Sequence, residues 1–426
     1  MKHLFFGGIH PSDKKSLSTN NMSFQTIIPE KVILPLRQHR GAECTPLVKV
    51  GDYVLRGQKI ADGSGLCVPV HSSVSGYVEK IEPCMTSSNE EIMSIVIKND
   101  LLDKTIEYNK YSNGDLVDFI RESGIVGMGG ASFPTYVKVS SAIEKVDTLI
   151  ANGCECEPYI TADDALLRTK PEDVLNGIKL LGDLIKPQRL VLAIEDNKVE
   201  AIAKLQALQE KFEGIEIKVL PTRYPQGSEK QLVQAVTGRE IPPTGLPGDV
   251  KCAVFNVSTL AQVYNSIETG APLIERIVTV TGEGINNPQN FIVKLGTPVS
   301  DLINAAGGLK ENAELVIAGG PMMGSSFDNL SCPVTKSVNS ILCLASSEEA
   351  KLSKCIRCGK CLSVCPMKLQ PIYMYRFANV ENYKKLEKLN VIDCMGCGAC
   401  SYTCPAKLPL TDTFKKVKIK MKEVKE

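Results

Sequence analysis

The C-terminal part of the chain contains the feature that most restricts its fold, a cysteine motif that occurs twice. CIRCGKCLSVCP places Cys355, Cys358, Cys361 and Cys365 before Pro366, and CMGCGACSYTCP places Cys394, Cys397, Cys400 and Cys404 before Pro405. With this spacing, three thiolates surround one cubane iron–sulfur cluster and the fourth cysteine ligates the other cluster. The motifs therefore predict two 4Fe-4S clusters, the first held by Cys355, Cys358, Cys361 and Cys404, the second by Cys394, Cys397, Cys400 and Cys365.

Other uses of the cysteines fit this pattern less well. A pair of four-cysteine zinc sites is the alternative, but such sites use paired C-x-x-C knuckles and have no role for a third cysteine in each run. The four histidines, His3, His10, His39 and His71, are far in sequence from the motifs. Disulfides are disfavoured in a reducing cytosol for a chain with ample hydrophobic core. Clusters remain the favoured interpretation.

Length and composition limit the class of protein. A chain of 426 residues, 43% hydrophobic, is long enough for about three domains with ordinary cores. The formal net charge of +1 gives no basic excess for nucleic acid, so we expect no nucleic-acid partner. No apolar run approaches the roughly 18 residues of a membrane span. The apolar stretch in the first residues, MKHLFFGGIHPSDKK, is too short for a secretory signal. We expect the chain to stay in the cytoplasm.

The segment between the motifs and the tail after them both favour helices. The apolar residues of the intervening segment suit short helices better than a hairpin: Ile372, Tyr375, Phe377, Tyr383, Leu386 and Leu389. The tail TDTFKKVKIKMKEVKE predicts a basic helix. Its charges are either a solvated face or a surface that docks on a membrane subunit or an acidic partner.

The N-terminal region predicts a small β domain. PLVKVGDYVLRGQKIADG and VHSSVSGYVEKIE contain short β-type runs that break at Gly51, Gly57, Gly63 and Gly76. The pattern resembles half of a lipoyl or biotinyl carrier domain, but the turn Gly63-Ser64-Gly65 has no lysine to modify. We therefore expect a scaffold rather than a carrier. FFGGIHP, which precedes it, is interpreted as a loop, with packing against a neighbour as an alternative.

The middle of the chain has an α/β pattern. TLIANG, LVLAIE and EIKVLP are expected buried strands among the helical runs PEDVLNGIKLLGDLI and KVEAIAKLQALQEKF, which predicts a sheet flanked by helices. RIVTVTGEGINNPQNFIVKLGTPVSDLINAAGGL then suits a small β-grasp domain. The fold class is multidomain α/β and α+β, with four expected domains: a barrel-sandwich domain at 1–112, a Rossmann-like domain at 113–275, a β-grasp domain of the SLBB type at 276–352, and a helical two-cluster domain at 353–426.

Four short segments in the α/β region carry candidate binding residues. The stretch GIVGMGGASFPTYVK, 124–138, is either a phosphate cradle or a turn, because glycine clusters occur in both. CECEPYI follows the strand TLIANG and places Glu155 and Glu157 at the carboxyl end of a strand, where open α/β sheets bind ligands. RYPQGSEKQLV contributes Tyr224, Gly227 and Glu229, and VFNVSTLAQV contributes Asn256 and Thr259.

In this order, the segments resemble the flavin site of the NADH-binding flavoprotein subunit of respiratory complex I, which has G-x-x-G-x-G-G-A-G-F-P-T, N-x-x-E-x-E-P, Y-x-x-G-E-E and N-N-V-E-T-L. The resemblance implies an FMN site at Gly127, Gly129, Gly130 and Lys138. It implies that Asn152, Glu155 and Glu157 face flavin and NAD(H), and that Tyr224, Asn256 and Thr259 close the pocket. Bare backbone can approach a phosphate closely, and lysine offers it a charge.

The chain departs from that pattern at five positions. Ser132 replaces the glycine before Phe-Pro-Thr, Cys154 an aspartate, and Ser228 the first glutamate of Y-x-x-G-E-E. Phe255 and Ser258 replace the first asparagine and the glutamate of N-N-V-E-T-L. The acidic residues help to seat the dinucleotide in that family, so the departures leave the implied FMN site in place but leave the detailed NAD(H) contacts open.

Over almost its whole length the chain resembles the RnfC family of the Rnf electron-transport complex, through FFGGIHP, the carrier-like domain, the flavin-type loop, the β-grasp segment and the twin motifs. The resemblance implies a peripheral subunit on the cytoplasmic side of the cell membrane, in an ion-translocating ferredoxin:NAD oxidoreductase. Its partners would be integral-membrane subunits and other iron–sulfur or flavin subunits, with NAD(H) as substrate and ferredoxin reached indirectly. The alternatives are a soluble reductase like the cobalamin-reducing flavoprotein of bacterial microcompartments and a flavin-free electron relay.

Overall fold

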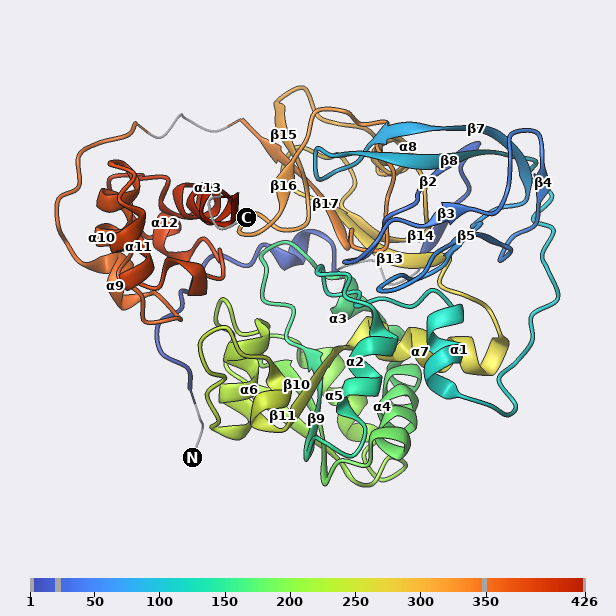
Figure 1. Ribbon diagram of the computed structural model, residues 1–426, viewed down its shortest axis with the longest axis horizontal. Helices are drawn as coiled ribbons and strands as arrows, with labels where there is room; N and C mark the ends of the chain where they lie inside the picture. The colour runs from blue at the N-terminus through green and yellow to red at the C-terminus, as the bar shows by residue number, and fades with distance from the viewer. Residues whose placement is uncertain (1–3, 20–23, 347–350, 424–426) are drawn as a thin grey trace.

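The computed structural model describes residues 4–19, 24–346 and 351–423. Figure 1 shows a helical domain at one end, an α/β domain below, and two β-rich domains that lie side by side above it. The predicted fold class is confirmed: barrel-sandwich, Rossmann-like, β-grasp and two-cluster regions follow one another along the chain. Parts of the predicted domains and of the basic tail, at 1–3, 20–23, 347–350 and 424–426, lie outside the described residues.

The α/β domain is built on a four-stranded parallel sheet in the order β11-β10-β9-β12. Its strands are β9 (Thr148–Gly153), β10 (Arg189–Glu195), β11 (Ile215–Leu220) and β12 (Cys252–Asn256). The helices of the domain are α1 (Leu116–Glu122), α2 (Thr135–Ala142), α3 (Ala162–Thr169), α4 (Pro171–Ile185), α5 (Val199–Ala207), α6 (Glu229–Thr237), η2 (Pro247–Val250) and α7 (Val257–Thr269). Neighbouring residues of β9 point to opposite faces of the sheet: Leu149 belongs to one hydrophobic core and Ile150 to another, which includes residues of α6. Both faces of the sheet are therefore covered.

Helices α4 and α7 show why these residues form these elements. Pro171 begins α4, and Glu172 and Asp173 lie in its first turn, where acidic side chains favour a helix N-terminus. Asn256 caps α7 by accepting a hydrogen bond from the Ser258 N–H. A Cβ at Gly177 would lie 2.2 Å from the Leu260 carbonyl oxygen, so the two helices approach this closely only because α4 has a glycine there.

The barrel-sandwich region contains two small antiparallel sheets. Their strands are β2 (Lys31–Pro35), β3 (Thr45–Pro46), β4 (Tyr53–Val54), β5 (Lys59–Asp62), β6 (Val70–His71), β7 (Gly76–Met85) and β8 (Glu91–Asn99). The buried side chains of Val32, Leu34, Ile95 and Ile97 lie between them in the core. Loops of this region support the glycine-rich loop of the α/β domain, since the Arg40 N–H donates to the Ser132 carbonyl oxygen at 3.1 Å.

The β-grasp domain has a six-stranded sheet in the order β1-β14-β13-β17-β15-β16. Its elements are β13 (Glu275–Thr281), β14 (Gln289–Lys294), α8 (Val299–Ala305), β15 (Ala313–Ala318), β16 (Ser325–Ser326) and β17 (Ser340–Ala345). The edge strand β1 (Gln25–Ile27) comes from the N-terminal region and runs parallel to β14. Residues 25–27 thus belong to this sheet rather than to the barrel-sandwich, because the backbone groups on the free edge of β14 require a partner.

The helical domain consists of short helices around a small apolar core. They are α9 (Lys360–Ser363), α10 (Pro371–Ala378), α11 (Tyr383–Lys388), η3 (Val391–Asp393), α12 (Ala399–Tyr402) and α13 (Leu410–Glu423). Met374, Leu386 and Phe414 are almost fully buried within it. The short helices between the motifs and the basic helix after them form as the sequence predicts.

The N-terminal segment before β1 joins domains that are far apart in sequence. It includes η1 (Lys15–Leu17), and Ile9 forms an antiparallel bridge with Tyr224 of the α/β domain. The Gly8 N–H donates to the Val364 carbonyl oxygen of the helical domain at 2.9 Å. FFGGIHP therefore packs against two neighbouring domains.

No helix in the described part of the chain is both long enough and apolar enough to span a membrane.

Candidate cofactor sites

The cysteines of the second motif line an internal cavity of the helical domain. Cys394, Cys397 and Cys400 share this cavity with Cys365 of the first motif, and the apolar side chains of Met374 and Phe414 complete the wall. Four thiols in an otherwise apolar enclosure form the donor set that a 4Fe-4S cluster requires. The residues present therefore fit the cluster that the spacing predicts.

The causes of the thiol pKa shifts indicate the same two groups of cysteines that the spacing predicts. Burial, together with the neighbouring Cys394, Cys397 and Cys365, raises the pKa of Cys400 to about 12, although the hydrogen bond from Thr411 opposes the shift. Burial also raises the pKa of Cys361, and Cys404 and Cys355 add to this effect. Cys365 thus lies with the second motif and Cys404 with the first. Among the described residues, no three His, Cys, Asp or Glu side chains are close enough to hold a single metal ion.

The second-motif loop is in contact with the α/β and β-grasp domains. The Tyr224 hydroxyl, which is buried, donates to the Cys397 carbonyl oxygen at 2.7 Å. A Cβ at Gly398 would lie 3.0 Å from the Met322 carbonyl oxygen of the β-grasp domain. From α13, the Lys418 Nζ donates to the Cys394 carbonyl oxygen at 2.9 Å. The first motif differs, since Cys355 and Cys358 are exposed.

The glycine-rich loop is a closed turn whose tip is exposed. The Gly127 N–H donates to the Phe133 carbonyl oxygen at 2.8 Å and closes the loop, whereas Gly129 and Gly130 are exposed. Gly130 has a φ of +109° and has no neighbouring atom within 4 Å of a Cβ built there. The bare backbone is thus open to a ligand, and α2 begins directly after the loop. These features fit a phosphate-bearing cofactor.

Helix α7 anchors the loop from behind. The Thr259 Oγ1 accepts a hydrogen bond from the Met128 N–H at 2.9 Å, and a Cβ at Gly129 would lie 3.3 Å from the Asn256 Cβ. The structure therefore brings Gly127, Gly129, Asn256 and Thr259 together. Arg276, buried at the start of β13, donates from its guanidinium to the Met128 carbonyl oxygen at 3.0 Å. Burial lowers the pKa of Arg276 to about 10.

Asp163 is a member of this group that sequence reasoning missed. Its carboxylate accepts hydrogen bonds from the Asn256 Nδ2 at 2.7 Å and the Ser258 hydroxyl at 2.6 Å. Burial raises the pKa of Asp163 to about 6, with Glu155 acting in the same direction. Ser258, one of the departures from the complex I pattern, thus binds an acidic side chain from α3. The consecutive acids of TADDALL were the available signal for this residue.

Lys138 and Asn152 both contact the segment around Gly227. The Lys138 Nζ donates to the Glu229 carboxylate at 2.6 Å and lies 5.7 Å from the centre of the Phe255 ring. The Asn152 Nδ2 donates to the Gly227 carbonyl oxygen at 2.9 Å, and its Oδ1 accepts from the Cys154 N–H. Asn152 therefore shapes the turn after β9, and Lys138 neutralises an acid at the start of α6.

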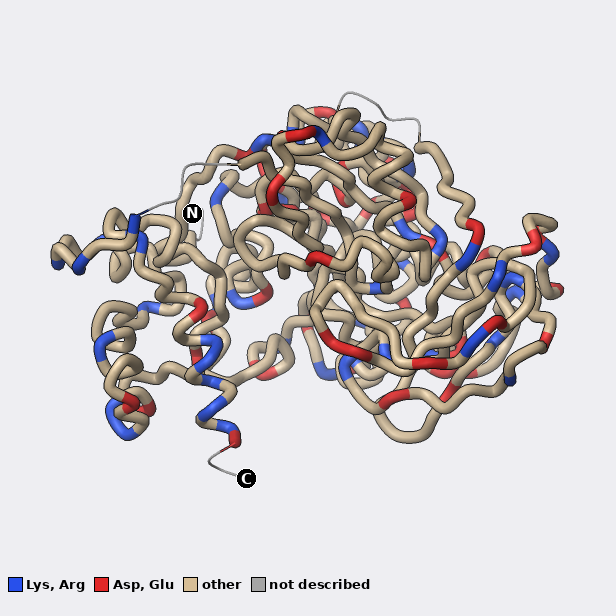
Figure 2. Tube along the Cα trace, turned by 90° about the horizontal axis from the view of Figure 1, so that it is seen from above, with Lys and Arg blue, Asp and Glu red and all other residues tan. Residues whose placement is uncertain are grey.

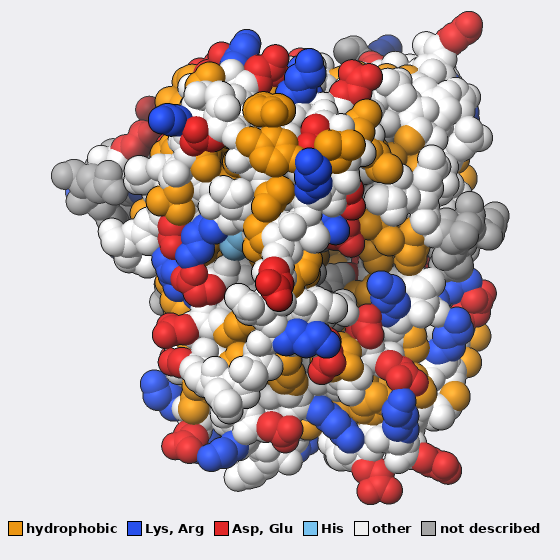
Figure 3. Space-filling model, turned by 90° about the vertical axis from the view of Figure 1, so that its right-hand side faces the viewer, with side chains coloured by type: hydrophobic (Ala, Val, Ile, Leu, Met, Phe, Trp, Pro, Cys, Tyr) orange, Lys and Arg blue, Asp and Glu red, His pale blue; other side chains and the backbone are white. Residues whose placement is uncertain are grey.

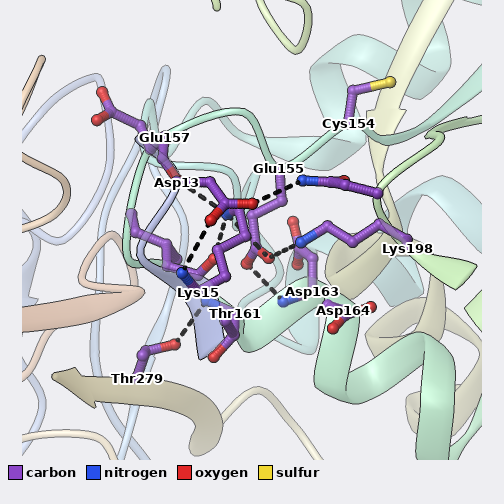
Figure 4. Close-up of polar contacts among 12 residues, drawn as sticks. Asp13, Lys15, Cys154, Glu155, Glu157, Thr161, Asp163, Asp164, Lys198 and Thr279 are labelled. Atoms are coloured by element: carbon purple, nitrogen blue, oxygen red, sulfur yellow. Dashed lines mark hydrogen bonds and ion pairs between the residues drawn. The ribbon is translucent and has the colours of Figure 1, made fainter. Parts of the chain in front are cut away.

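Glu155 points into a buried cluster of charges, shown in Figure 4. Its carboxylate accepts a hydrogen bond from the Asp163 N–H at 2.8 Å and pairs with Lys198 at 3.6 Å and Lys15 at 3.9 Å. The Lys15 Nζ also donates to the Glu157 carbonyl oxygen at 2.8 Å. Burial lowers the pKa of Lys15 to about 8, and Lys198 contributes to this shift. Neither lysine was predicted. Lys15 reaches this position from the N-terminal segment, which is far from Glu155 in the sequence.

Glu157 points toward the β-grasp domain. Its Oε2 accepts a hydrogen bond from the Met322 N–H at 3.1 Å, and a Cβ at Gly320 would lie 2.2 Å from the same oxygen. Burial raises the pKa of Glu157 to about 7, although the Met322 N–H and Lys15 oppose the shift. The predicted residues Glu155, Glu157 and Tyr224 therefore contact three different parts of the molecule. Glu155 and Glu157 connect the turn after β9 to the N-terminal segment and the β-grasp domain, and Tyr224 connects the loop after β11 to the helical domain.

Four family models match successive parts of the chain. A barrel sandwich hybrid domain described for RnfC matches residues 3–101, the Nuo51 FMN-binding domain 120–265, the SLBB domain 277–325, and a 4Fe-4S dicluster domain 354–408. The chain shares its fold with the NAD+-reducing [NiFe]-hydrogenase in the H2-reduced state, with a TM-score of 0.51 and 19% identity over 71% of this chain and 62% of that one. Such an arrangement defines a multidomain electron-transfer subunit with an FMN-binding domain and a two-cluster domain.

The C subunit of the Na(+)-translocating ferredoxin:NAD(+) oxidoreductase complex of Acetobacterium woodii is 42% identical over 92% of this chain and 91% of that relative. The C subunit of the ion-translocating oxidoreductase complex of Klebsiella pneumoniae is 40% identical over 99% of the chain, which spans 58% of that longer relative. The chain belongs to the family of C subunits of ion-translocating oxidoreductase complexes, the Rnf type.

Proposed function

We propose that this chain is the NAD(H)-reacting subunit of an ion-translocating ferredoxin:NAD oxidoreductase, peripheral on the cytoplasmic side of the cell membrane. Electrons move between NAD(H), FMN and two 4Fe-4S clusters. Integral-membrane subunits and other iron–sulfur or flavin subunits of the complex are its partners, and ferredoxin is reached through them. The near full-length similarity to the Acetobacterium woodii protein supports this proposal.

The observation that carries the proposal is the contact of the second cysteine motif with the loop after β11 and with Met322 of the β-grasp domain. The Tyr224 hydroxyl bonds to the backbone of Cys397, and Met322, whose N–H binds Glu157, lies against Gly398. A cluster in the cavity of Cys365, Cys394, Cys397 and Cys400 is therefore the one next to the flavin-binding domain. The exposed first motif, completed by Cys404, holds the cluster that exchanges electrons with another subunit.

The residues that would hold FMN are those of the glycine-rich loop and its surroundings. Gly129 and Gly130 would present bare backbone to a phosphate, and Gly127 closes the loop. Lys138, which pairs with Glu229 here, would supply a positive charge. Asn256 and Thr259 hold the loop against α7, while Asn152, Glu155 and Glu157 shape the turn that faces flavin and NAD(H). When bound, FMN accepts or donates electrons in pairs with a nicotinamide and singly with a cluster. The chain sets the geometry of that exchange.

We also propose that the four domains are divided at 112/113, 275/276 and 352/353, with β1 shared between the first region and the β-grasp sheet. The second motif contacts both the α/β and the β-grasp domains, which supports direct electron transfer between them. In the proposed function the two clusters act in series from the flavin-binding domain outward.

A cofactor inventory tests the function. Purified chain is expected to contain about eight irons and one FMN, at four irons per cluster, and to pass electrons from NADH to ferricyanide. Gly129→Val is expected to abolish FMN binding and leave the iron content intact, because a branched side chain keeps the backbone from a phosphate. Gly248→Val is the matched control, since Gly248 has nothing within 4 Å of a built Cβ.

The outcomes separate the proposal from its alternatives. Normal FMN content in folded Gly129→Val would refute the flavin loop, and a chain without flavin would leave an electron relay. Purification free of integral-membrane subunits from native membranes would support a soluble reductase. Zinc in place of iron would overturn the assignment of both motifs.

A further inference from the structure

The charge of the helical domain differs sharply from that of the whole chain. Residues 353–426 contain 15 Lys and Arg against 6 Asp and Glu, whereas the 426-residue chain has a formal net charge of only +1. Figure 2 shows that Lys and Arg outnumber Asp and Glu along this domain. On the face of the molecule in Figure 3, in contrast, acidic and basic side chains are mixed. The basic excess is therefore local to the domain with the cysteine motifs.

Within this domain, the first motif combines positive charge with access to a cluster. Every residue from 351 to 360 is exposed, including the ligands Cys355 and Cys358. Lys354, Arg357 and Lys360 alternate with these cysteines along the chain. Two apolar side chains, Leu352 and Ile356, are 69% and 66% exposed beside them. An exposed apolar centre among charged residues is typical of a protein interaction surface.

The position of this segment in the fold leaves it free for a partner. Figure 1 shows the chain before α9 running along the outer side of the helical domain, away from the other domains. The second motif lies on the opposite side, in contact with Tyr224 and Met322. Within the described parts of the chain, no ion pair joins Lys354, Arg357 or Lys360 to an acidic side chain. Their charges are available to an approaching molecule.

We propose that the surface formed by Leu352, Lys354, Ile356, Arg357 and Lys360 docks a protein whose acidic face surrounds its own one-electron centre. We refer to these residues as the first-motif surface. Complementary charge steers such a partner so that its redox centre meets the exposed edge of the first cluster. This inference rests on the proposed function, because it assumes a cluster ligated by Cys355, Cys358, Cys361 and Cys404.

A protein fits this surface better than an anionic membrane does. The charges surround cluster ligands, and only a partner with a redox centre gains from close contact there. An anionic membrane would instead bind the basic helix α13, where Lys416, Lys420 and Lys422 are exposed. The two basic regions therefore make different predictions, and α13 supplies a control with the same number of reversed charges.

A small acidic ferredoxin in its oxidised form stands in for the partner, as an acidic protein with a one-electron centre, and its binding to the chain with its cofactors tests the proposal. We expect calorimetry to show binding at about 20 mM salt that weakens roughly tenfold at about 200 mM, as screening shortens the reach of the charges. The variant Lys354→Glu, Arg357→Glu, Lys360→Glu is expected to weaken binding at low salt at least about tenfold. The control Lys416→Glu, Lys420→Glu, Lys422→Glu should change the affinity less than about twofold.

Four results would overturn the proposal: no binding of ferredoxin by the wild-type chain, equal losses in the two variants, a larger loss in the α13 variant, or unchanged binding in the first-motif variant. Sedimentation with vesicles of equal parts phosphatidylcholine and phosphatidylglycerol is the second measurement. If the first-motif variant lost only vesicle binding, the surface would be a membrane contact instead. Iron and FMN content and NADH-dependent reduction of ferricyanide are measured for each chain. Their failure in the wild type would refute the proposed function, whereas normal values with unchanged ferredoxin binding would refute the docking surface alone.

Discussion

The two cysteine motifs have the same spacing but different surroundings. In the first motif, Cys355 and Cys358 are exposed, whereas Cys397 and Cys400 of the second are buried. Even the equivalent glycines differ: Gly359 and Gly398 have φ values of +75° and +78°, yet nothing lies within 4 Å of a Cβ at Gly359, while Met322 contacts one at Gly398. An identical local sequence spacing thus serves an outward cluster in one copy and an inward cluster in the other.

The difference shows that tertiary contacts, rather than the motif, assign each cluster its role. Reduction potential depends on hydrogen bonds, charge and solvent exposure around a cluster. The second motif has the Tyr224 hydroxyl and the Lys418 ammonium on its backbone carbonyls, whereas the predicted ligands Cys355 and Cys358 of the first are exposed to solvent. Substitutions that act on one motif and spare the other therefore test the comparison.

The largest expected effect comes from exchanging the fourth ligand of each cluster. Cys404→Ser should perturb the cluster of the first motif and Cys365→Ser that of the second, because Cys404 acts on Cys361 of the first motif and Cys365 shares a cavity with Cys394, Cys397 and Cys400. Paramagnetic resonance of the reduced clusters, referenced to Cys358→Ser and Cys397→Ser, distinguishes the two. If Cys404→Ser gave the spectrum of Cys397→Ser, each motif would be a self-contained four-cysteine site.

The equivalent glycines provide a matched pair of smaller substitutions. Gly359→Ala introduces backbone strain alone, about 1–2 kcal/mol for an alanine in the left-handed region. Gly398→Ala adds a contact 3.0 Å from the Met322 carbonyl oxygen to a similar strain. Thermal unfolding should show the greater loss of stability for Gly398→Ala, together with faster loss of the second cluster. Equal losses would mean that the contact with the β-grasp domain does not distinguish the motifs.

Glu157, which binds Met322 near the second motif, is expected to make the stability of the protein depend on pH. Its folded-state pKa of about 7 is raised above the ordinary 4.5, so its contribution to stability is complete below about pH 4.5 and is lost as pH rises through about 7. The loss is at most about 3 kcal/mol. Glu157→Gln, which resembles the protonated form, should reduce the fall in melting temperature between about pH 5 and pH 8.

The same variant should also weaken NADH-dependent flavin reduction more than FMN retention, which stopped-flow absorbance and flavin content measure. An identical pH dependence of the melting temperature in Glu157→Gln and the wild type would show that this carboxyl group does not titrate in that range. Unchanged reduction kinetics would remove Glu157 from the nicotinamide site.

The smallest expected effect is a shift in one reduction potential. Tyr224→Phe removes the hydroxyl that donates to the Cys397 carbonyl oxygen. A hydrogen bond worth about 1 kcal/mol corresponds to a shift on the order of 40 mV for one electron. The potential of the second cluster should become more negative, because the lost donor favoured the reduced state, while that of the first stays constant. Tyr402→Phe, at an exposed tyrosine of α12, is the control, and a shift of both clusters in Tyr224→Phe would indicate a general structural change.

Local sequence was sufficient for the fold class and for many elements, because spacing and periodicity act over a few residues, although the helical run that ends at Phe212 forms a helix only over Val199–Ala207. The strand at 148–153 and the helix at 171–185 have the bounds of the predicted runs TLIANG and PEDVLNGIKLLGDLI. The cysteine spacing likewise predicted two clusters, and a 4Fe-4S dicluster domain matches residues 354–408. The assignment of individual ligands and flavin contacts stays a prediction, with the positions of Cys365 and Cys404 in its support.

Other features depended on contacts between residues far apart in sequence. Lys15 pairs with Glu155 across 140 positions of the chain, β1 completes a sheet whose other strands begin at Glu275, and Tyr224 reaches Cys397. No local pattern specifies such partners, because a buried charge, a free strand edge or a buried hydroxyl requires only some partner of suitable chemistry. The packing of the domains determines which partner each of these groups contacts. By itself, the sequence determined the fold class, most of the main strands and helices and the twin cluster motifs; the tertiary structure alone decided which motif lies inward and which is exposed.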